Sequence, residues 1–489
     1  MTTHAFPGGL HLAPHKQESL TGPIRPALIP SHLVLPLKQH NGAASVPCVS
    51  VGEQVLGGQM IAAPGLARGI GLHAPTSGTI VEIGERPVVH AVLRYARAIV
   101  IEPDGEDRWA EPGAWSPADG AEALRAAGLA GLGGAAFPTA DKLAAGAVHT
   151  LIINGAECEP YITCDEALLR ERADRVVRGA KHLANLSGAK SVQFAVEDNM
   201  PGAITALDQA LRTAADARMR MVVVPTIYPT GSERQLVQVL TGMPVPRGKR
   251  AIDLGIVCVN VGTAAAVTAV FDDGRPLVSR VATITGPAVA EPHNREVLIG
   301  TPIGELLEAA GGAGSSLSCL LLGGPMMGVR VRDIDAPVPK AGNCVLALDL
   351  VCDRNAIGAQ PCIRCGACVE VCPELLLPQE ILWAAGTGDA ERPAHNGLEV
   401  CIECGCCEVV CPSHIPLVQR FREAKFALRE FRQEQARARR AKDRHAARVT
   451  RLERREAEKA AKRAAKRAAL AARNAPATGQ PADGADKSV

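Results

Sequence analysis

Eight cysteines in two copies of one spacing constrain this chain more than any other feature. The first run is Cys362-x2-Cys365-x2-Cys368-x3-Cys372, and the second is Cys401-x2-Cys404-x2-Cys407-x3-Cys411, each followed by proline. Thiolates are soft ligands that suit iron, and a C-x2-C-x2-C turn brings three of them to one cluster. The fourth cysteine of each run ligates the other cluster in two-cluster ferredoxins. The pattern therefore predicts two [4Fe–4S] clusters, held by Cys362, Cys365, Cys368 and Cys411 and by Cys401, Cys404, Cys407 and Cys372.

Zinc is the main alternative metal that such cysteines could bind. Zinc sites favour pairs of C-x2-C at longer separations, and the repeated run with its prolines argues against them. Cys406 falls outside the spacing, and we expect a free buried thiol there. Cys158 and Cys164 are expected in the core. A chain with these clusters moves electrons one at a time.

Length and cysteine usage limit the class of protein. A chain of 489 residues is expected to form three or four domains. Its 16 cysteines accompany no secretory signal, which argues against a disulfide framework. The longest mostly apolar run, residues 255–271, is shorter than a membrane-spanning helix requires. We therefore expect a soluble or peripheral protein in a reducing compartment.

Charge is concentrated near the C-terminus. Residues 420–473 hold 20 Lys/Arg against 7 Asp/Glu, although the whole chain has a net charge of only +2. The segment has a helical pattern rich in Ala, Arg, Lys and Glu. Such a helix can bind an anionic membrane surface or nucleic acid, and a solvated helix is the plain alternative. We predict no nucleic-acid partner.

The remaining chain divides into modules by its pattern of apolar residues. Short β-like runs over residues 31–102 resemble the small barrel of biotinyl and lipoyl carrier domains, but Ala62–Leu72 has no lysine for a swinging arm. Residues 117–245 alternate strand and helix patterns, which predicts an α/β domain with a mostly parallel sheet. Residues 275–311 read as a β-grasp-like module.

A glycine-rich segment is the first candidate for binding a small molecule. GLAGLGGAAFPT (128–139) precedes Lys142. Its backbone N–H groups could approach a phosphate, with a helix N-terminus after Pro138 and the Lys142 charge in support. No clear strand precedes the segment, so it fits the dinucleotide-binding fingerprint poorly.

Four segments in order resemble a known flavoprotein. GLAGLGGAAFPT parallels GLxGxGGAGFPT of the flavin- and NADH-binding subunit of respiratory complex I, and NGAECEPY (154–161) parallels its N-x-D-E-x-E-P-G. YPTGSER (228–234) and NVGT (260–263) are similar to its two remaining flavin loops. With the double cysteine motif and the phrase CPSHIPLVQ (411–419), the chain resembles the RnfC family of the Rnf electron-transport complex, over roughly residues 8–425.

The resemblance implies a non-covalent FMN with NADH stacked on its ring. The residues that would line the FMN are Gly131, Gly133, Gly134, Lys142, Asn154, Gly231, Glu233, Asn260 and Thr263. Glu157, Glu159 and Phe137 would face the dinucleotide. A helix-capping or salt-bridge role is the alternative for the two glutamates. Ala156, Ser232 and Val259 depart from the complex I pattern, so the flavin contacts are expected to differ there.

The expected fold class is therefore multidomain, with α/β and α+β parts. The predicted modules are an irregular N-terminal segment (1–30), a small biotinyl/lipoyl-like β-barrel (31–110), an α/β FMN/NADH-binding domain (115–250), a β-grasp or SLBB-like module (251–335), a ferredoxin-like 2[4Fe–4S] segment (336–420), a long basic helix (421–475) and a disordered tail (476–489).

The function that the resemblance implies is oxidation of NADH through FMN, with single electrons leaving through the clusters. No catalytic acid or base is required for hydride transfer. The implied partners are the membrane subunits of an Rnf-type complex and a ferredoxin-like acceptor, with this chain peripheral on the cytoplasmic face of the bacterial inner membrane. The alternatives are a soluble cobalamin reductase with similar modules and a flavin-free electron carrier or scaffold.

Overall fold

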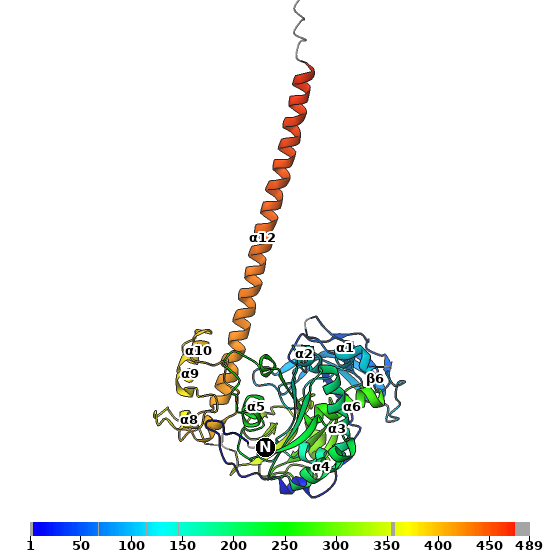
Figure 1. Cartoon of the computed structure of the whole chain (residues 1–489), viewed down its shortest axis with the longest axis vertical. Coiled ribbons are helices and arrows are strands. Elements are labelled where there is room, and N and C mark those ends of the chain that lie inside the picture. The colour runs from blue at the N-terminus through cyan, green and yellow to red at the C-terminus, as the bar shows by residue number, and fades with distance from the viewer. Residues whose placement is uncertain (1–2, 67, 114, 145, 354–356, 475–489) are drawn as a thin grey trace, which may run out of the picture. The chain divides into compact units, whose positions relative to one another are not determined.

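The computed structural model describes residues 3–66, 68–113, 115–144, 146–353 and 357–474 (Figure 1). The chain divides into two compact units, Met1–Lys425 and Phe426–Val489. The first unit contains every sheet.

The N-terminal barrel module contains two antiparallel sheets. One has the strand order β1-β7-β6-β3 and the other β2-β4-β5. The strands are β1 (Leu33–Pro36), β2 (Val46–Pro47), β3 (Gln54–Val55), β4 (Met60–Ala63), β5 (Leu72–His73), β6 (Gly78–Pro87) and β7 (Tyr95–Pro103). Leu33, Ile61, Ile80 and Ile99 are fully buried between the sheets. Apolar side chains at alternate strand positions thus form the core of this module.

The next domain is built on a parallel sheet of order β10-β9-β8-β11. Its elements are η2 (Pro117–Asp119), α1 (Gly120–Ala126), α2 (Thr139–Ala144), β8 (Thr150–Gly155), α3 (Cys164–Ser187), β9 (Ser191–Glu197), α4 (Pro201–Ala214), β10 (Met219–Val224), α5 (Glu233–Thr241), η3 (Ala251–Leu254), β11 (Ile256–Asn260) and α6 (Val261–Asp273). The boundary predicted at residue 250 is wrong, because β11 pairs with β8 in this sheet.

Strands β8, β9 and β11 are largely buried, as in parallel sheets covered on both faces, whereas the edge strand β10 has exposed residues. Leu151, Ile152 and Ile153 of β8 are all fully buried. Helix α3 packs against both α4 and α6 (Figure 1). The carboxyl ends of β8 and β11 place Asn154 and Asn260 at one edge of the sheet, where open α/β sheets bind ligands.

A mixed five-stranded sheet of order β13-β12-β16-β14-β15 follows. Its elements are β12 (Ser279–Thr285), β13 (His293–Leu298), α7 (Ile303–Glu308), β14 (Leu317–Leu322), β15 (Val329–Arg330) and β16 (Cys344–Asp349). The predicted boundary at residue 335 is also wrong, because β16 pairs between β12 and β14. Long-range strand pairing of this kind has no local sequence signal.

The cysteine-rich segment contains short helices joined by irregular chain. They are α8 (Ala367–Glu370), α9 (Pro378–Ala385), α10 (Arg392–His395) and α11 (Cys406–Val409). The two cysteine runs have the same backbone conformation: Arg364 and Glu403 have φ of 58° and 59°, and Gly366 and Gly405 have φ of 83° and 79°. Ala367 in the first run therefore corresponds to Cys406 in the second, which supports the interpretation of Cys406 as a non-ligand.

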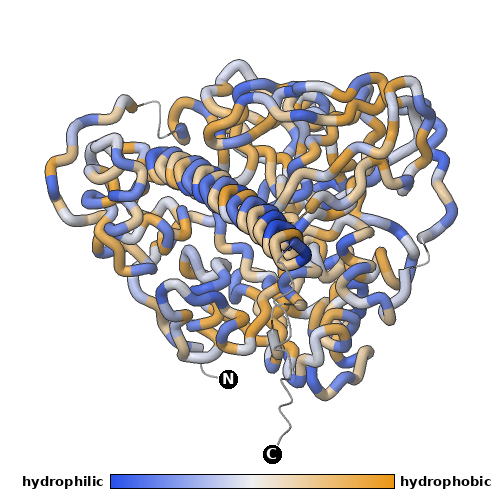
Figure 2. Tube along the Cα trace, turned by 90° about the horizontal axis from the view of Figure 1, so that it is seen from above, coloured by the Kyte–Doolittle hydropathy of each residue, from blue (hydrophilic) through white to orange (hydrophobic). Residues whose placement is uncertain are grey.

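The last helix, α12, runs from Leu417 to Arg473 and so begins four residues before the predicted basic helix. Its part in the second unit is exposed at almost every position, and hydrophilic residues recur along it (Figure 2). In the part of the chain that the structure describes, no helix combines the length and apolar character needed to cross a membrane. The predicted disordered tail (476–489) lies outside the described residues.

The N-terminal segment has one short helix, η1 (Gln17–Leu20), and is otherwise irregular, but it is well packed. Lys16 and Ser19 are buried. The main chain of Leu10 exchanges two hydrogen bonds with that of Tyr228, and the Tyr161 N–H donates to the Pro14 carbonyl. The segment therefore lies against the loops that follow β8 and β10, at the carboxyl edge of the parallel sheet.

Candidate functional site

The glycine-rich segment forms an open loop between α1 and α2. Gly133, Gly134 and Ala135 are exposed. Within the described chain, their N–H groups donate no hydrogen bond. The N–H of Leu132 donates to the hydroxyl of buried Thr263 at 2.9 Å, which attaches the loop to the start of α6. Free N–H groups on an exposed loop form a site suited to an anion such as a phosphate.

The two asparagines predicted to line FMN organise the sheet edge beside this loop. Asn154 donates through Nδ2 to the Gly231 carbonyl at 2.8 Å. Asn260 accepts from the Gly262 N–H as the N-cap of α6 and donates to the Asp165 carboxylate at 2.6 Å. Gly231 must be glycine, because a Cβ there would lie 2.2 Å from the Ala156 carbonyl oxygen. The structure thus brings together Asn154 and Gly231, and separately Thr263 and the glycine loop.

Lys142 and Glu233, both predicted to contact FMN, pair with each other. Lys142 Nζ lies 2.7 Å from Glu233 Oε2 and 2.8 Å from the Cys258 carbonyl oxygen. Burial opposes the charge of Lys142, but the Glu233 carboxylate outweighs it and raises the Lys142 pKa. Lys142 is therefore a protonated cation at the base of the glycine-rich loop. It is held by Glu233, the first residue of α5.

Glu157 and Glu159 both have hydrogen-bond partners within the chain. Glu157 is buried and accepts from the N–H groups of Asp165 and Glu166 at the start of α3, with Lys16 Nζ at 3.8 Å. Glu159 accepts from the N–H groups of Met326 and Met327 at 2.8 and 2.7 Å. Both carboxylates thus have structural partners, as in the capping alternative. Phe137 lies under the Arg68 guanidinium, 5.4 Å from it.

Glu157 belongs to a group of three side chains that could in principle bind a metal ion, the one such group found outside the cysteine runs in the described residues. Glu157, Cys164 and Asp165 bring one ligand atom each within 4.8 Å of one another. The Cys164 thiol donates to Glu157, and the Lys16 ammonium is already beside that carboxylate. These contacts explain why the three side chains lie close together without a bound metal ion.

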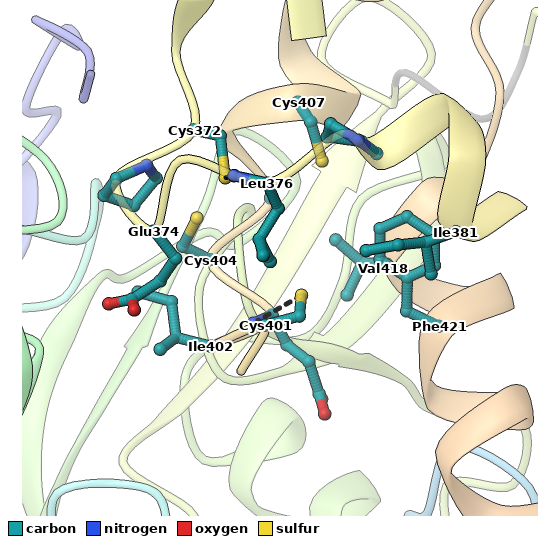
Figure 3. Close-up of a pocket in the computed structure, with 14 residues that line it drawn as sticks. Cys372, Glu374, Leu376, Ile381, Cys401, Ile402, Cys404, Cys407, Val418 and Phe421 are labelled. Carbon is teal, nitrogen blue, oxygen red and sulfur yellow. Dashed lines mark hydrogen bonds between the residues drawn. The ribbon is translucent and has the colours of Figure 1, made fainter. Parts of the chain in front are cut away.

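Four of the predicted iron ligands line one pocket (Figure 3). Cys372, Cys401, Cys404 and Cys407 surround a space bordered by apolar side chains that include Leu376, Ile381 and Phe421. This is the combination predicted for the second cluster, with Cys372 contributed by the first run.

The sulfur atoms of the motif cysteines are not spaced as in a zinc site. Tetrahedral zinc would hold its thiolates about 3.8 Å apart, given a Zn–S bond of about 2.3 Å. No three sulfurs of the eight motif cysteines, all within the described residues, come within 4.8 Å of one another. The thiols of the described cysteines therefore do not gather at the spacing of a zinc site.

The other predicted set is more accessible. Cys362, Cys368 and Cys411 are partly buried against the same apolar residues, whereas Cys365 is exposed. Cys406 is fully buried and does not line the pocket. One cluster site is thus enclosed and the other reaches the surface.

Residues that the sequence did not single out connect the enclosed cysteines (Cys372, Cys401, Cys404 and Cys407) to the flavin-type loops, the segments that resemble the flavin loops of the complex I subunit. The Tyr228 hydroxyl donates to the Cys404 carbonyl at 2.5 Å. Arg234 Nε lies 3.0 Å from Glu374 Oε2, beside Cys372. Met326 is buried with Tyr228, Cys404 and Cys406. Tyr228 and Arg234 lie within the YPTGSER segment, which was their one sequence signal, whereas nothing local marked Met326 or Glu374.

Four domain families match the sequence in this order. They are the RnfC barrel sandwich hybrid domain (residues 4–106), the Nuo51 FMN-binding domain (124–269), the SLBB domain (281–330) and the 4Fe-4S dicluster domain (361–415). The chain therefore carries cofactor domains for FMN and for two [4Fe–4S] clusters, as the sequence predicted. The FMN-binding match includes β11 and most of α6.

Curated relatives cover nearly the whole chain. The C subunit of the ion-translocating oxidoreductase complex from Pseudomonas aeruginosa is 49% identical over 467 residues, which cover 94% of this chain and 60% of the relative. The protein of the same name from Salmonella gallinarum is 44% identical over 460 residues, covering 92% and 68%. The chain spans about three fifths of the length of the first of these relatives.

Among solved structures, an NAD+-reducing [NiFe]-hydrogenase in the air-oxidized state matches at 23% identity and a TM-score of 0.45. The match covers 55% of this chain and 53% of that one.

Proposed function

The chain belongs to the RnfC family, the C subunits of ion-translocating oxidoreductase complexes, and from this premise we propose that it oxidises NADH at FMN and delivers single electrons through its two clusters to the rest of the complex. FMN, when bound, accepts two electrons as a hydride and releases them one at a time. The chain's own residues must hold the flavin, orient the nicotinamide, exclude water and order the exit path.

The free N–H groups of Gly133, Gly134 and Ala135 support FMN binding at the glycine-rich loop. They can hold the phosphate, while Lys142 supplies a positive charge nearby. Asn154 and Asn260 lie on neighbouring strands at one sheet edge, Gly231 contacts Asn154, and Thr263 contacts the glycine-rich loop. With Glu233, these residues would hold the remainder of the flavin.

One observation carries the proposal: the enclosed cysteine set is packed directly against the flavin-type loops. Tyr228 begins the YPTGSER loop and is hydrogen-bonded to Cys404. Met326 is buried between the same elements. A cluster held by Cys372, Cys401, Cys404 and Cys407 would therefore receive electrons first. The second cluster, with exposed Cys365, would pass them to a partner.

The proposed partners are the membrane subunits of an Rnf-type complex, with a ferredoxin-like protein as the eventual acceptor. We place the chain as a peripheral subunit on the cytoplasmic face of the bacterial inner membrane, because a chain with an outward electron path requires a docking partner. The basic part of α12 would approach the anionic lipid surface there.

An anaerobic titration tests the proposal. The full chain is reconstituted with iron, sulfide and FMN, NADH is added, and the visible spectrum and low-temperature EPR are followed. We expect the flavin absorbance to bleach and reduced [4Fe–4S] signals to follow. If NADH leaves the flavin oxidised while dithionite still reduces the clusters, the chain is an electron carrier fed by another protein.

A further inference from the structure

Two buried cations lie on the inner side of the glycine-rich loop. Lys340, which precedes β16, is 1% exposed and donates through Nζ to the carbonyls of Gly128 (2.7 Å) and Gly71 (3.1 Å). Arg280 of β12 donates through Nη1 to the carbonyls of Leu132 (3.0 Å) and Lys340 (2.8 Å). Both cations therefore hold the loop by its carbonyl oxygens.

The loop is consequently polarised between its two sides. Its carbonyls at Gly128 and Leu132 face buried positive charge, whereas the N–H groups of Gly133, Gly134 and Ala135 are exposed and without partners among the described residues. A side chain at position 128 would disrupt this arrangement. Its Cβ would lie 2.9 Å from Lys340 Nζ, and φ there is +76°.

The charge on Lys340 has no balancing carboxylate. Across the described residues, no acidic side chain forms an ion pair with it. The titratable groups around it are Arg280 and two histidines, His40 (after β1) and His73 of β5. Burial and the Lys340 charge lower the pKa of His40 to about 4 and that of His73 to about 3, so both are neutral.

A buried ammonium without a counter-ion is costly, and such groups are common at functional sites. Burial lowers the pKa of Lys340 to about 7. A negative charge arriving on the far side of the loop would stabilise the protonated amine. One peptide of the loop connects the two sides: the Leu132 carbonyl accepts from Arg280, which also bonds the Lys340 carbonyl, and the N–H of the same peptide belongs to exposed Gly133. Lys340 itself acts through space, from its position beside the Gly128 carbonyl.

We propose that Lys340 is a positioning residue for a phosphate-bearing ligand at the glycine-rich loop, and that ligand binding and protonation of Lys340 favour each other. The inference rests on the proposed function, in which FMN is that ligand. According to this inference, a lysine outside the flavin-binding domain (residues 124–269) increases the affinity of the loop for its ligand.

Isothermal titration of the full chain with FMN tests this coupling. Titrations at pH 7.5 and 8.5, in buffers of different ionisation enthalpy, count the protons taken up when the flavin phosphate is already ionised. We expect uptake of a fraction of one proton and an affinity that falls by up to about tenfold per pH unit. Lys340→Met should bind FMN more weakly at pH 7.5 and with no proton uptake. Exposed Lys38, two residues before His40, supplies the control Lys38→Met, which should match the parent chain.

The outcomes separate the two proposals. If the parent chain binds no FMN, the proposed function fails. If it binds FMN without taking up protons, or if Lys340→Met takes up as many, this inference is overturned. The proton count of the parent chain needs no variant, so the test holds even if Lys340→Met does not fold.

Discussion

The hydroxyl of Tyr228 donates a hydrogen bond of 2.5 Å to the main-chain carbonyl of Cys404, which lies 176 residues further along the chain. Tyr228 is 3% exposed, and its ring packs with Met326 and Cys406. Burial and the nearby Glu159 charge raise the pKa of the phenol well above its usual range, so it remains a donor. The YPTGSER loop and the enclosed cysteine set are therefore joined by a buried hydrogen bond, beside the Arg234–Glu374 pair.

Replacing Tyr228 by phenylalanine should slow electron transfer between these two parts. The ring and its packing remain, but the hydrogen bond that fixes Cys404 is lost, at a cost of about 1 kcal/mol. We expect cluster reduction after NADH addition to slow by roughly fivefold, while flavin bleaching keeps its rate. Stopped-flow absorbance separates the two phases. Tyr95→Phe, at a tyrosine that is 59% exposed, is the matched control; an equal loss of rate there would remove the special role of Tyr228.

Replacement of Cys372 and replacement of Cys406 should have different effects on the iron content of the chain. Cys372→Ser removes a thiolate from the enclosed set, so iron should fall from about eight atoms per chain to about four. Cys406→Ser should keep both clusters, because Cys406 is fully buried outside the pocket. Colorimetric iron analysis and EPR of the dithionite-reduced chain measure both variants. Loss of a cluster in Cys406→Ser would mean that the ligand set is different.

Variants of Glu159 test whether its side chain has a structural role or binds the dinucleotide. Glu159→Ala removes the acceptor shared by the N–H groups of Met326 and Met327, at about 1 kcal/mol per hydrogen bond. Glu159→Gln keeps a carbonyl oxygen for them. We therefore expect faster amide hydrogen exchange around residues 323–328 in the alanine variant only. If the glutamine variant instead loses NADH affinity with unchanged exchange, Glu159 faces the dinucleotide, as the family resemblance implies.

Glu197, at the carboxyl end of β9, should make stability depend on pH. It is fully buried and neither carboxylate oxygen has a hydrogen-bond partner among the described residues. Burial raises its pKa to about 7, whereas the unfolded carboxyl ionises near 4.5. The folded chain thus binds more protons between these values. Stability should fall as pH rises from about 4.5 to 7, and then remain low.

Glu197→Gln removes that dependence. We expect a higher unfolding midpoint than the parent chain at pH 8, corresponding to at most about 3 kcal/mol, and little difference near pH 5. Thermal melts across this range measure it. The exposed Glu85→Gln variant should follow the parent chain at every pH. A Glu197→Gln variant that is less stable at pH 8 would mean that the carboxylate has a stabilising partner.

Spacing in the sequence was enough to predict several features of the fold. The eight cysteines, the strands of the parallel sheet and the glycine-rich loop depend on nearby residues, so local pattern reveals them. The module boundaries at 250 and 335 were misplaced because β11 and β16 join sheets through partners far away in the chain. Pairing between distant strands is a property of the folded chain.

The sequence by itself determined the ligand types: a repeated spacing of thiolates suited to two iron–sulfur clusters, and a loop whose glycines let the backbone approach a phosphate. Only the tertiary structure decided what surrounds them. It gave Glu157 and Glu159 structural partners, set Tyr228 on Cys404, and placed Lys340 behind the glycine-rich loop. The reason is physical: ligand identity depends on side-chain type and short spacing, whereas burial, charge balance and hydrogen-bond partners arise when segments hundreds of residues apart are packed together.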